Sequence, residues 1–450
     1  MNILKNLLQT KNFKLCIAIV TAQQILVATG TYLMGDLAAT VLVQGLSIPR
    51  VVILVLCLIL SGSLFHFLMK HFMVLAQRDV LKAYFDKYAE ANFSRPDIWR
   101  SKEIKETKHD IMVREGQDTI TQSVQFAADT VATGLNVILN TVSVILVTSP
   151  AMGLSILVAG LLGLLVIHCA DKMISQAAEK EMLAQNEVNN SLARSWDNIV
   201  LGNKTSYHRW MDGFSDLFAK AKQASLYNVK INDGATSIAS FITSSVVMVS
   251  VCALLYFSKN DLSKVIALLI MLPRSMQIVF HIQIIQSYWA HWKYLLQRLK
   301  MTEATYSSVD AEDLDKYINK AKIQIVSNVS TVSTTEDILL HSTGRFTVTG
   351  ENGAGKSTLL LKLKDKIGTK GFYIPSHHHL ELSDSSFSKS SGEVAMMALK
   401  DALADSASTV LLDEWDANLS KDNQAKLNDL INEISKTKLV IEVRHHHVTA

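Results

Sequence analysis

The chain has 450 residues, of which 49% are hydrophobic and only 19% are charged. Its mean hydropathy is +0.20, and its formal net charge at pH 7 is +3. So few charged residues exclude an intrinsically disordered chain, and so small a net charge argues against a nucleic-acid-binding protein, which usually carries a dense basic surface. The apolar excess predicts instead that much of the chain contacts lipid.

Six apolar segments lie within residues 1–290, and each can supply the ~20 residues that cross the hydrocarbon core of a bilayer. They lie at about 15–46, 50–75, 126–149, 151–170, 235–257 and 262–286. Residues 1–290 are therefore predicted to form a polytopic α-helical membrane domain with six transmembrane helices. The first segment is too long for the apolar part of a signal peptide, so it is predicted to be an uncleaved membrane helix.

The connections between these segments alternate between short and long. The two long connections, 76–125 and 171–234, are polar and have the composition of helices. Lysine and arginine concentrate in them and in the N-terminus, and positive residues favour the cytoplasmic side of a membrane. The N-terminus, both long connections and the C-terminal region are therefore predicted to be cytoplasmic. Residues 291–320 are predicted to form a helical extension and a linker.

Some polar residues and all four cysteines lie inside the apolar segments. Arg274 lies in the middle of the sixth segment, where it either lines a substrate path or makes an interhelical hydrogen bond. No two cysteines have a CxxC or zinc-site spacing. They are predicted to be small buried hydrophobic residues, at Cys16, Cys57, Cys169 and Cys252.

Beyond residue 320 the pattern changes to short strands alternating with helices, which predicts an α/β domain over 321–450. A strand at 346–349 leads into a glycine-rich loop, and a helical run at 359–366 follows, in the context of a phosphate-binding loop. The loop residues expected to bind a nucleotide are Gly350, Glu351, Asn352, Gly353, Ala354, Gly355, Lys356, Ser357 and Thr358. Backbone amides would wrap the phosphates, Lys356 would reach the β and γ phosphates, and Ser357 would bind Mg²⁺.

Three further motifs follow the loop. An apolar strand at 409–412 ends at Asp413 and Glu414, where Asp413 is expected to hold Mg²⁺ and Glu414 to act as the general base towards water. The sequence Ser-Ser-Gly-Glu at 390–393 precedes a helix predicted at 394–404. A last strand at 438–443 ends close to His445, which can contact a γ-phosphate.

These six spans and four motifs together resemble a half-transporter of the ATP-binding cassette (ABC) exporter family. Ser390 and Gly392 belong to a segment that resembles the family signature Leu-Ser-Gly-Gly-Gln. Asp413 follows Ser390 by 23 residues and His445 follows Asp413 by 32 residues, as in that family. The sequence Leu-Leu-Asp-Glu-Trp at 411–415 is similar to the variant in the cyclic-peptide and siderophore exporter branch.

The resemblance implies a dimer, formed with a second copy or with a related half-transporter, in which two cassettes sandwich ATP and Mg²⁺. Each phosphate loop would face the signature residues Ser390 and Gly392 of the other subunit, and Glu414 and His445 would be catalytic. By alternating access, such a dimer would export a peptide or another amphipathic small molecule across a bacterial-type inner membrane. Too few residues precede the first span for a leader-cleaving peptidase domain, so any leader would be removed elsewhere.

The predicted cassette departs from the family pattern. Only 34 residues separate Lys356 from Ser390, which is too few for most of the helical subdomain that presents the signature and receives the coupling helices. Ser376 stands where a glutamine is expected, and Ser333 lies near the place of the adenine-stacking aromatic residue. The fold class is therefore a membrane domain followed by an α/β P-loop NTPase cassette that lacks most of this subdomain.

Two alternative functions stay open. One is a membrane protein whose reduced cassette binds ATP as a sensor or partner subunit without efficient hydrolysis or transport. The other is a lipid flippase, which shares the mechanism and differs in cargo. Two histidine triplets, at 377–379 and 445–447, contain the residue type that binds zinc, copper or nickel. Adjacent histidines on a strand point to opposite faces, however, so a triplet is a poor chelator.

Overall fold

The computed structural model describes all residues except 1, 45–47, 100, 102–103, 105–107, 110, 307–312, 328–336, 377–379, 381–390, 418 and 445–450. Inside helices it describes no side chains for 2, 36–61, 114, 262–263, 290 and 391–392. The chain forms two compact units, each built from two stretches of sequence. The first contains Met1–Lys87 and Ile111–Thr305, and the second contains Tyr88–Asp110 and Tyr306–Ala450.

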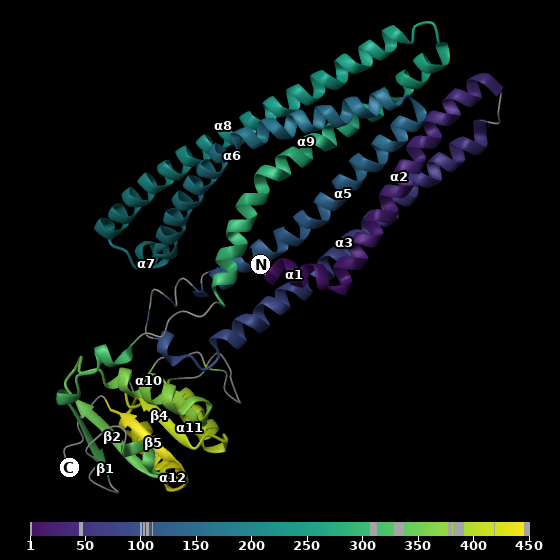
Figure 1. Cartoon of the computed structure of the whole chain (residues 1–450). Helices are drawn as coiled ribbons and strands as arrows, with labels where there is room; N and C mark the ends of the chain where they lie inside the picture. Colours follow the sequence, from purple (N-terminus) through teal and green to yellow (C-terminus); the bar gives the residue numbers. More distant parts are fainter. Residues whose placement is uncertain are drawn as a thin grey trace. The chain divides into compact units, whose positions relative to one another are not determined.

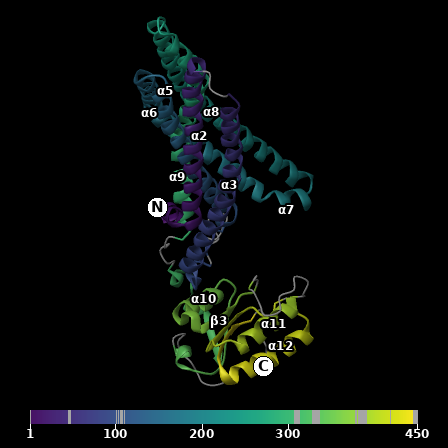
Figure 2. The same ribbon diagram turned by 90° about the vertical axis from the view of Figure 1, so that its right-hand side faces the viewer.

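The first unit is helical (Figure 1). Its helices are α1 (Asn2–Gln9), α2 (Lys11–Gln44), α3 (Ile48–Asn92, ending in the second unit), α5 (Gln117–Val147), α6 (Pro150–Ala193), α7 (Ser195–Val200), α8 (Lys204–Phe257) and α9 (Leu262–Ala304). Helices α6 and α8 run side by side, and the short α7 lies between them in the chain (Figure 2). The predicted connection 171–234 is thus largely a continuation of these two helices.

Among the described residues, five helices are long and apolar enough to cross a membrane: α2, α5, α6, α8 and α9. Large apolar side chains on their outer surfaces are exposed, such as Leu161 and Phe241. Large exposed apolar surfaces of this kind mark sites of contact with a membrane or another protein. The predicted span 50–75 lies in α3, and because side chains 36–61 are not described, this sixth span stays a prediction.

Hydrogen bonds between polar side chains join α2, α5 and α9 of the first unit. Arg274 of α9 donates from Nε and Nη2 to Oδ1 of Asn140 on α5, at 3.2 and 2.5 Å. Thr31 of α2 donates to the same oxygen at 2.9 Å. Arg274 also donates to Gln277 of its own helix at 2.6 Å. Of the two interpretations of Arg274, the interhelical hydrogen bond is thus present in the structure.

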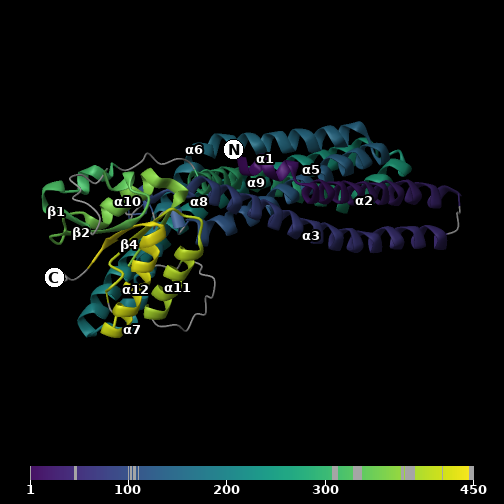
Figure 3. The same ribbon diagram turned by 90° about the horizontal axis from the view of Figure 1, so that it is seen from below.

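The second unit contains a five-stranded sheet in the order β1-β2-β5-β4-β3. The strands are β1 (Ile323–Ser327), β2 (Gly344–Gly350), β3 (Gly371–Ile374), β4 (Thr409–Asp413) and β5 (Leu439–Val443). Strand β1 is antiparallel to β2, and all other neighbours are parallel. Helix α10 (Lys356–Ile367) packs on one face, and α11 (Ser391–Ala404) and α12 (Lys421–Thr437) pack on the other (Figure 3).

Burial on both faces explains why the central strands are continuous apolar runs. All five residues of β4 and of β5 are buried. Leu411 and Ile441 join the cluster on the α10 side, whereas Val410 and Val440 join the cluster beside α11 and α12. The parallel register brings the carboxyl ends of β2, β3, β4 and β5 to one edge of the sheet, which is where ligands bind in parallel α/β folds.

Candidate functional site

The glycine-rich loop after β2 has a backbone conformation that residues with a Cβ atom rarely adopt. Gly350, Gly353 and Gly355 have φ of +154°, +82° and +90°. A Cβ atom at Gly355 would lie 2.1 Å from the carbonyl oxygen of Tyr317, and one at Gly350 would lie 2.3 Å from that of Lys322. The loop can therefore lie directly against the chain segment before β1, and it leads into the N-terminus of α10 with its free N–H groups.

Lys356 is the first residue of α10 and folds back over this loop. Its Nζ donates to the carbonyl oxygens of Gly350 at 2.9 Å and Glu351 at 3.2 Å. The ammonium therefore lies over the loop whose amides, together with the helix N-terminus, form an anion-binding concavity. A positive charge at this point suits the loop to bind phosphate oxygens.

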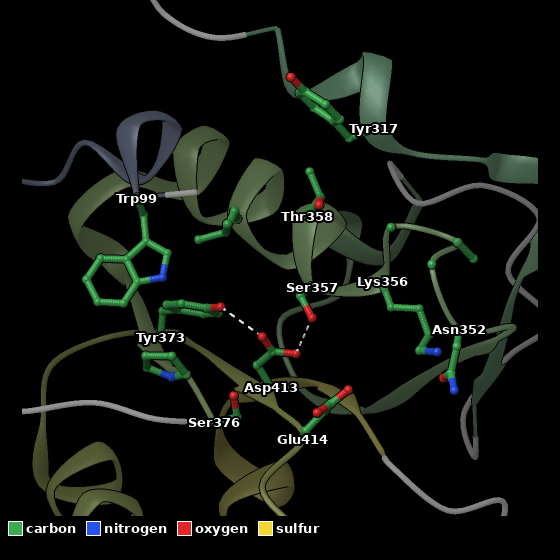
Figure 4. Close-up of a pocket in the computed structure, with 15 residues that line it drawn as sticks. Trp99, Tyr317, Asn352, Lys356, Ser357, Thr358, Tyr373, Ser376, Asp413 and Glu414 are labelled. Carbon is green, nitrogen blue, oxygen red and sulfur yellow. Dashed lines mark hydrogen bonds between the residues drawn. The ribbon is translucent and has the colours of Figure 1, made fainter. Parts of the chain in front are cut away.

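Three polar side chains meet at the carboxyl edge of the sheet (Figure 4). Ser357 donates from Oγ to Oδ1 of Asp413 at 2.8 Å, and Tyr373 donates from its hydroxyl to Oδ2 at 3.1 Å. Burial raises the pKa of Asp413, while the two hydrogen bonds oppose the rise. Burial and the Asp413 charge raise the pKa of Tyr373, so its hydroxyl stays protonated and remains a donor.

Glu414 follows β4 in a constrained conformation. Its φ is +47°, which is uncommon for a residue other than glycine. Its backbone N–H donates to the carbonyl oxygen of Val443 at 2.9 Å, and its carbonyl accepts from the N–H of Ala417 at 3.1 Å. The next residue, Trp415, donates from Nε1 to Glu442 at 2.8 Å. Glu414 is therefore held in place on both sides.

A buried ionic network supports this turn from β5. Glu442 has no exposed surface, and it accepts from Nε and Nη2 of Arg345 at 3.0 and 2.8 Å. Thr347 donates to it at 2.8 Å, and Arg444 donates to it at 3.0 Å. Arg444 also lies over the Trp415 ring, 5.3 Å from its centroid. The network thus contacts Trp415, the residue that follows Glu414.

The loop and the acidic pair line one pocket of about 480 Å³, a volume within the ~300–1,000 Å³ range of small-ligand sites. Predicted site residues that line it are Asn352, Gly353, Ala354, Gly355, Lys356, Ser357, Thr358, Asp413 and Glu414. The structure thus brings together most of the residues that the motifs identify. Ser376, where the family pattern has glutamine, lines the same pocket.

Three aromatic residues in this pocket were not predicted as site residues: Trp99, Tyr317 and Tyr373. Trp99 ends a short 3-10 helix, η1 (Pro96–Ile98), which contacts α10. Tyr317 lies in the predicted linker, and it is 41% exposed. An aromatic residue in a polar segment was the only available signal for Trp99 and Tyr317. Their proximity to the loop depends on how segments distant in sequence pack.

Other predicted residues lie outside the part of the chain that the structure describes. These are Ser390, His445, both histidine triplets and Ser333. Gly392 lies in the first turn of α11, for which only the backbone is described. The signature residues and the histidine after β5 therefore stay predictions.

The donor set at the carboxyl edge fits Mg²⁺. Ser357 and Asp413 supply the hydroxyl and carboxylate oxygens that this hard cation prefers. Within the described residues, no group of three or more His, Cys, Asp or Glu side chains could hold a metal ion. Mg²⁺ would therefore bind here together with phosphate oxygens and water, as is usual for this cation. The glycine-rich loop beside these two residues is suited to receive those phosphates.

Comparison with known proteins finds no relative from which a function could be transferred. No protein-family model matches this chain, and no curated protein is significantly similar to it. Function must therefore be inferred from the residues of the site. A phosphate-binding loop, a hydroxyl–carboxylate pair for a hard cation and a second carboxylate on a constrained turn can together bind and cleave a nucleoside triphosphate.

Proposed function

We propose that the second unit binds ATP with Mg²⁺ and hydrolyses it, and that the chain is one half of an ATP-driven exporter. The main observation behind this proposal is the hydrogen bond between Ser357, the last residue of the phosphate-loop motif, and Asp413 at the end of β4. These two residues are 56 positions apart in sequence. Their contact, beside Lys356 and Glu414 in one pocket, is the arrangement that phosphoryl transfer needs.

Each residue then has one task in the reaction. The loop amides and Lys356 bind and orient the phosphates, which contributes much of the catalysis of phosphoryl transfer. Ser357 and Asp413 would hold Mg²⁺, which would supply charge neutralisation at the phosphate oxygens. Glu414 accepts the proton of the attacking water, and its constrained turn holds the carboxylate beside Asp413. Tyr373 keeps Asp413 oriented through its hydroxyl.

The first unit supports the export half of the proposal through its membrane-length helices. The chain carries one phosphate loop, and a head-to-tail pair of cassettes needs two, so the working form is a dimer with a second copy or a related half-transporter. The cargo is a peptide or another amphipathic small molecule, and the membrane is a bacterial-type inner membrane with both termini in the cytoplasm. A lipid flippase would use the same cycle with a lipid as cargo.

A second candidate is a membrane-bound nucleotide sensor. The observation that favours it is Ser376, which lines the pocket where a glutamine would link the γ-phosphate to the membrane domain. The short chain between Lys356 and Ser390 points the same way. Such a protein would bind ATP and act as a sensor or partner subunit, without efficient ATP hydrolysis or transport.

The decisive experiment is to measure phosphate release by the full chain in lipid nanodiscs. Glu414→Gln should lower turnover by about 10²–10⁴-fold, the usual contribution of a general base, while ATP binding persists. Lys356→Ala should abolish both binding and turnover. Glu433→Gln is the matched control, since this carboxylate is exposed on α12 and its loss should change neither.

Two outcomes would contradict parts of the proposal. Unchanged turnover in Glu414→Gln would refute the assignment of the base. ATP binding without any turnover that depends on Lys356, alone or with candidate partner subunits, would favour the sensor. In inside-out vesicles, ATP-dependent uptake of a peptide and of a fluorescent lipid, measured side by side, separates the exporter from the flippase.

A further inference from the structure

The first unit contains a cavity that the nucleotide chemistry does not use. It has a volume of about 320 Å³ and lies among α6, α8 and α9. Its polar lining comes mainly from Glu181 of α6, Asn228 and Asn232 of α8, and His291 and Tyr294 of α9. Ile174 and Met182 add apolar surface to the same wall. The lining is thus mixed polar and apolar, and a volume of this size with convergent polar groups is within the range of small-ligand sites.

The polar groups of this cavity are rich in acceptors. Glu181 accepts from Oγ of Ser225 at 2.6 Å and from Nδ2 of Asn228 at 2.5 Å, so both of its partners are neutral. Because a carboxylate only accepts, the second bond also fixes which end of the Asn228 amide is oxygen. The Oδ1 atoms of Asn228 and Asn232 are buried and have no donor among the described residues.

Positive charge is missing from this cavity. Neither lysine nor arginine is among the residues that line it. The cations nearby have other partners. Lys293 forms an ion pair with Asp171, and Lys180 lies over the Tyr227 ring, 5.6 Å from its centroid. Arg298 lies 5.8 Å from the centroid of the Tyr294 ring, and its charge is paired with Asp118. A half-buried carboxylate with only neutral partners is poorly compensated. The Coulomb attraction of Glu181 is therefore available to a ligand.

We propose that this cavity binds the protonated amine of an organic cation that has an apolar body. An ammonium group offers one positive charge and hydrogen-bond donors, which match the Glu181 carboxylate. The rings of His291 and Tyr294, 5.7 Å apart, offer an aromatic surface for the apolar body of the ligand. Together with the proposed export function, on which this last step depends, the cavity identifies the cargo as a cationic amphiphile.

The test uses two fluorescent probes that differ only in charge. Dansylcadaverine carries a primary ammonium, and N-pentyl dansylamide has the same body without it. Binding of each to the full chain in nanodiscs is measured by dansyl fluorescence without ATP. Glu181→Gln should weaken dansylcadaverine binding by roughly 10- to 100-fold, as expected for a hydrogen bond to a charged group, and leave the neutral probe unchanged. Glu181→Asp, which keeps the charge, should retain most of the affinity.

The matched control is Glu179→Gln, an exposed carboxylate on the same helix with the same change in net charge. It should bind both probes as the unaltered chain does. Equal affinity of Glu181→Gln for dansylcadaverine would overturn the proposal, and so would an equal loss for both probes. Displacement of dansylcadaverine by millimolar Ca²⁺ only when Glu181 is present would assign the cavity to a metal ion instead. Lys356→Ala should bind the cationic probe normally, so failure of ATP hydrolysis and failure of this site are distinguishable.

Discussion

The buried carboxylate Glu442 offers the sharpest test of how the second unit is held together. Its two oxygens accept five hydrogen bonds, from Arg345 (twice), Thr347, Arg444 and Trp415. Glu442→Gln keeps the shape but replaces one oxygen with an NH₂ group, which then faces donors. Arg345 is only 8% exposed, so its charge stays buried without an anion.

The expected cost follows from this geometry. Removing one partner of a buried ion pair typically costs about 3–5 kcal/mol, because the remaining charge is desolvated and uncompensated. Replacing both partners by apolar residues of similar volume costs much less. We therefore expect Glu442→Gln to destabilise the second unit by about 3–5 kcal/mol, and the double change Arg345→Met with Glu442→Met to destabilise it less than Glu442→Gln alone.

Hydrogen exchange followed by mass spectrometry measures this in the full chain. Opening of β4 and β5 should become roughly 10²- to 4 × 10³-fold more frequent in Glu442→Gln, since every 1.4 kcal/mol is a factor of ten. The exposed Glu433→Gln should change the exchange by less than threefold, because surface substitutions usually stay within ~0.5 kcal/mol. An increase below fivefold for Glu442→Gln would refute the assignment of the network as a structural support of the turn at Glu414.

The pH dependence of the same exchange has a defined sign. Burial by itself would raise the pKa of Glu442, but the hydrogen bonds and charges of Arg345 and Arg444 outweigh it and hold the pKa below its ordinary value. A lowered folded-state pKa contributes stability that is present above the unfolded pKa and is lost as pH falls through the folded pKa. Protection of β5 should therefore decline in acid, and this part of the decline should be absent in Glu442→Gln.

Two further predictions concern the nucleotide pocket. Tyr373→Phe removes a hydrogen bond that lowers the pKa of Asp413, so this pKa should rise further. The acid limb of the pH–rate profile of ATP hydrolysis should therefore move to higher pH. An unchanged acid limb would contradict this role of Tyr373. Tyr317 lines the same pocket (Figure 4), and its ring can stack on the base of a nucleotide. Tyr317→Ala should therefore weaken ATP binding, measured by calorimetry, about tenfold. Binding of inorganic tripolyphosphate, which has no base, should be unchanged. Tyr317→Phe should bind ATP normally, and equal losses for both ligands would show a general defect.

The conformation of the glycine-rich loop was predictable because its signals are local. Glycines at 350, 353 and 355, followed by lysine and serine, specify a loop that only a backbone without Cβ atoms can form, and the structure has positive φ at all three. The strand before Asp413 was predictable from its run of apolar residues. The contact of Ser357 with Asp413 was also foreseeable, because parallel strands bring their carboxyl ends to one edge.

The support of the site was not predictable, because it depends on contacts between segments far apart in sequence. In the sequence, Arg345 and Glu442 look like ordinary charged residues of two separate strands. Only the pairing of β2 with β5 brings their side chains into contact. Trp99 lies in the predicted connection 76–125, yet residues 88–110 belong to the same compact unit as the phosphate loop. Hydrophobic periodicity describes one helix or strand at a time and does not report which distant segment covers it.

The sequence by itself thus determined the long apolar helices, the phosphate loop and the acidic pair, since each depends on residue types at short, fixed spacing. The tertiary structure alone decided that Trp99 and Tyr317 line the pocket beside the glycine-rich loop and that Glu442 accepts a hydrogen bond from Trp415, the residue after Glu414. It also decided that Glu181 faces a cavity without a lysine or arginine in its lining. Charge compensation and pocket shape depend on which side chains meet in space, and spacing along the chain does not encode this.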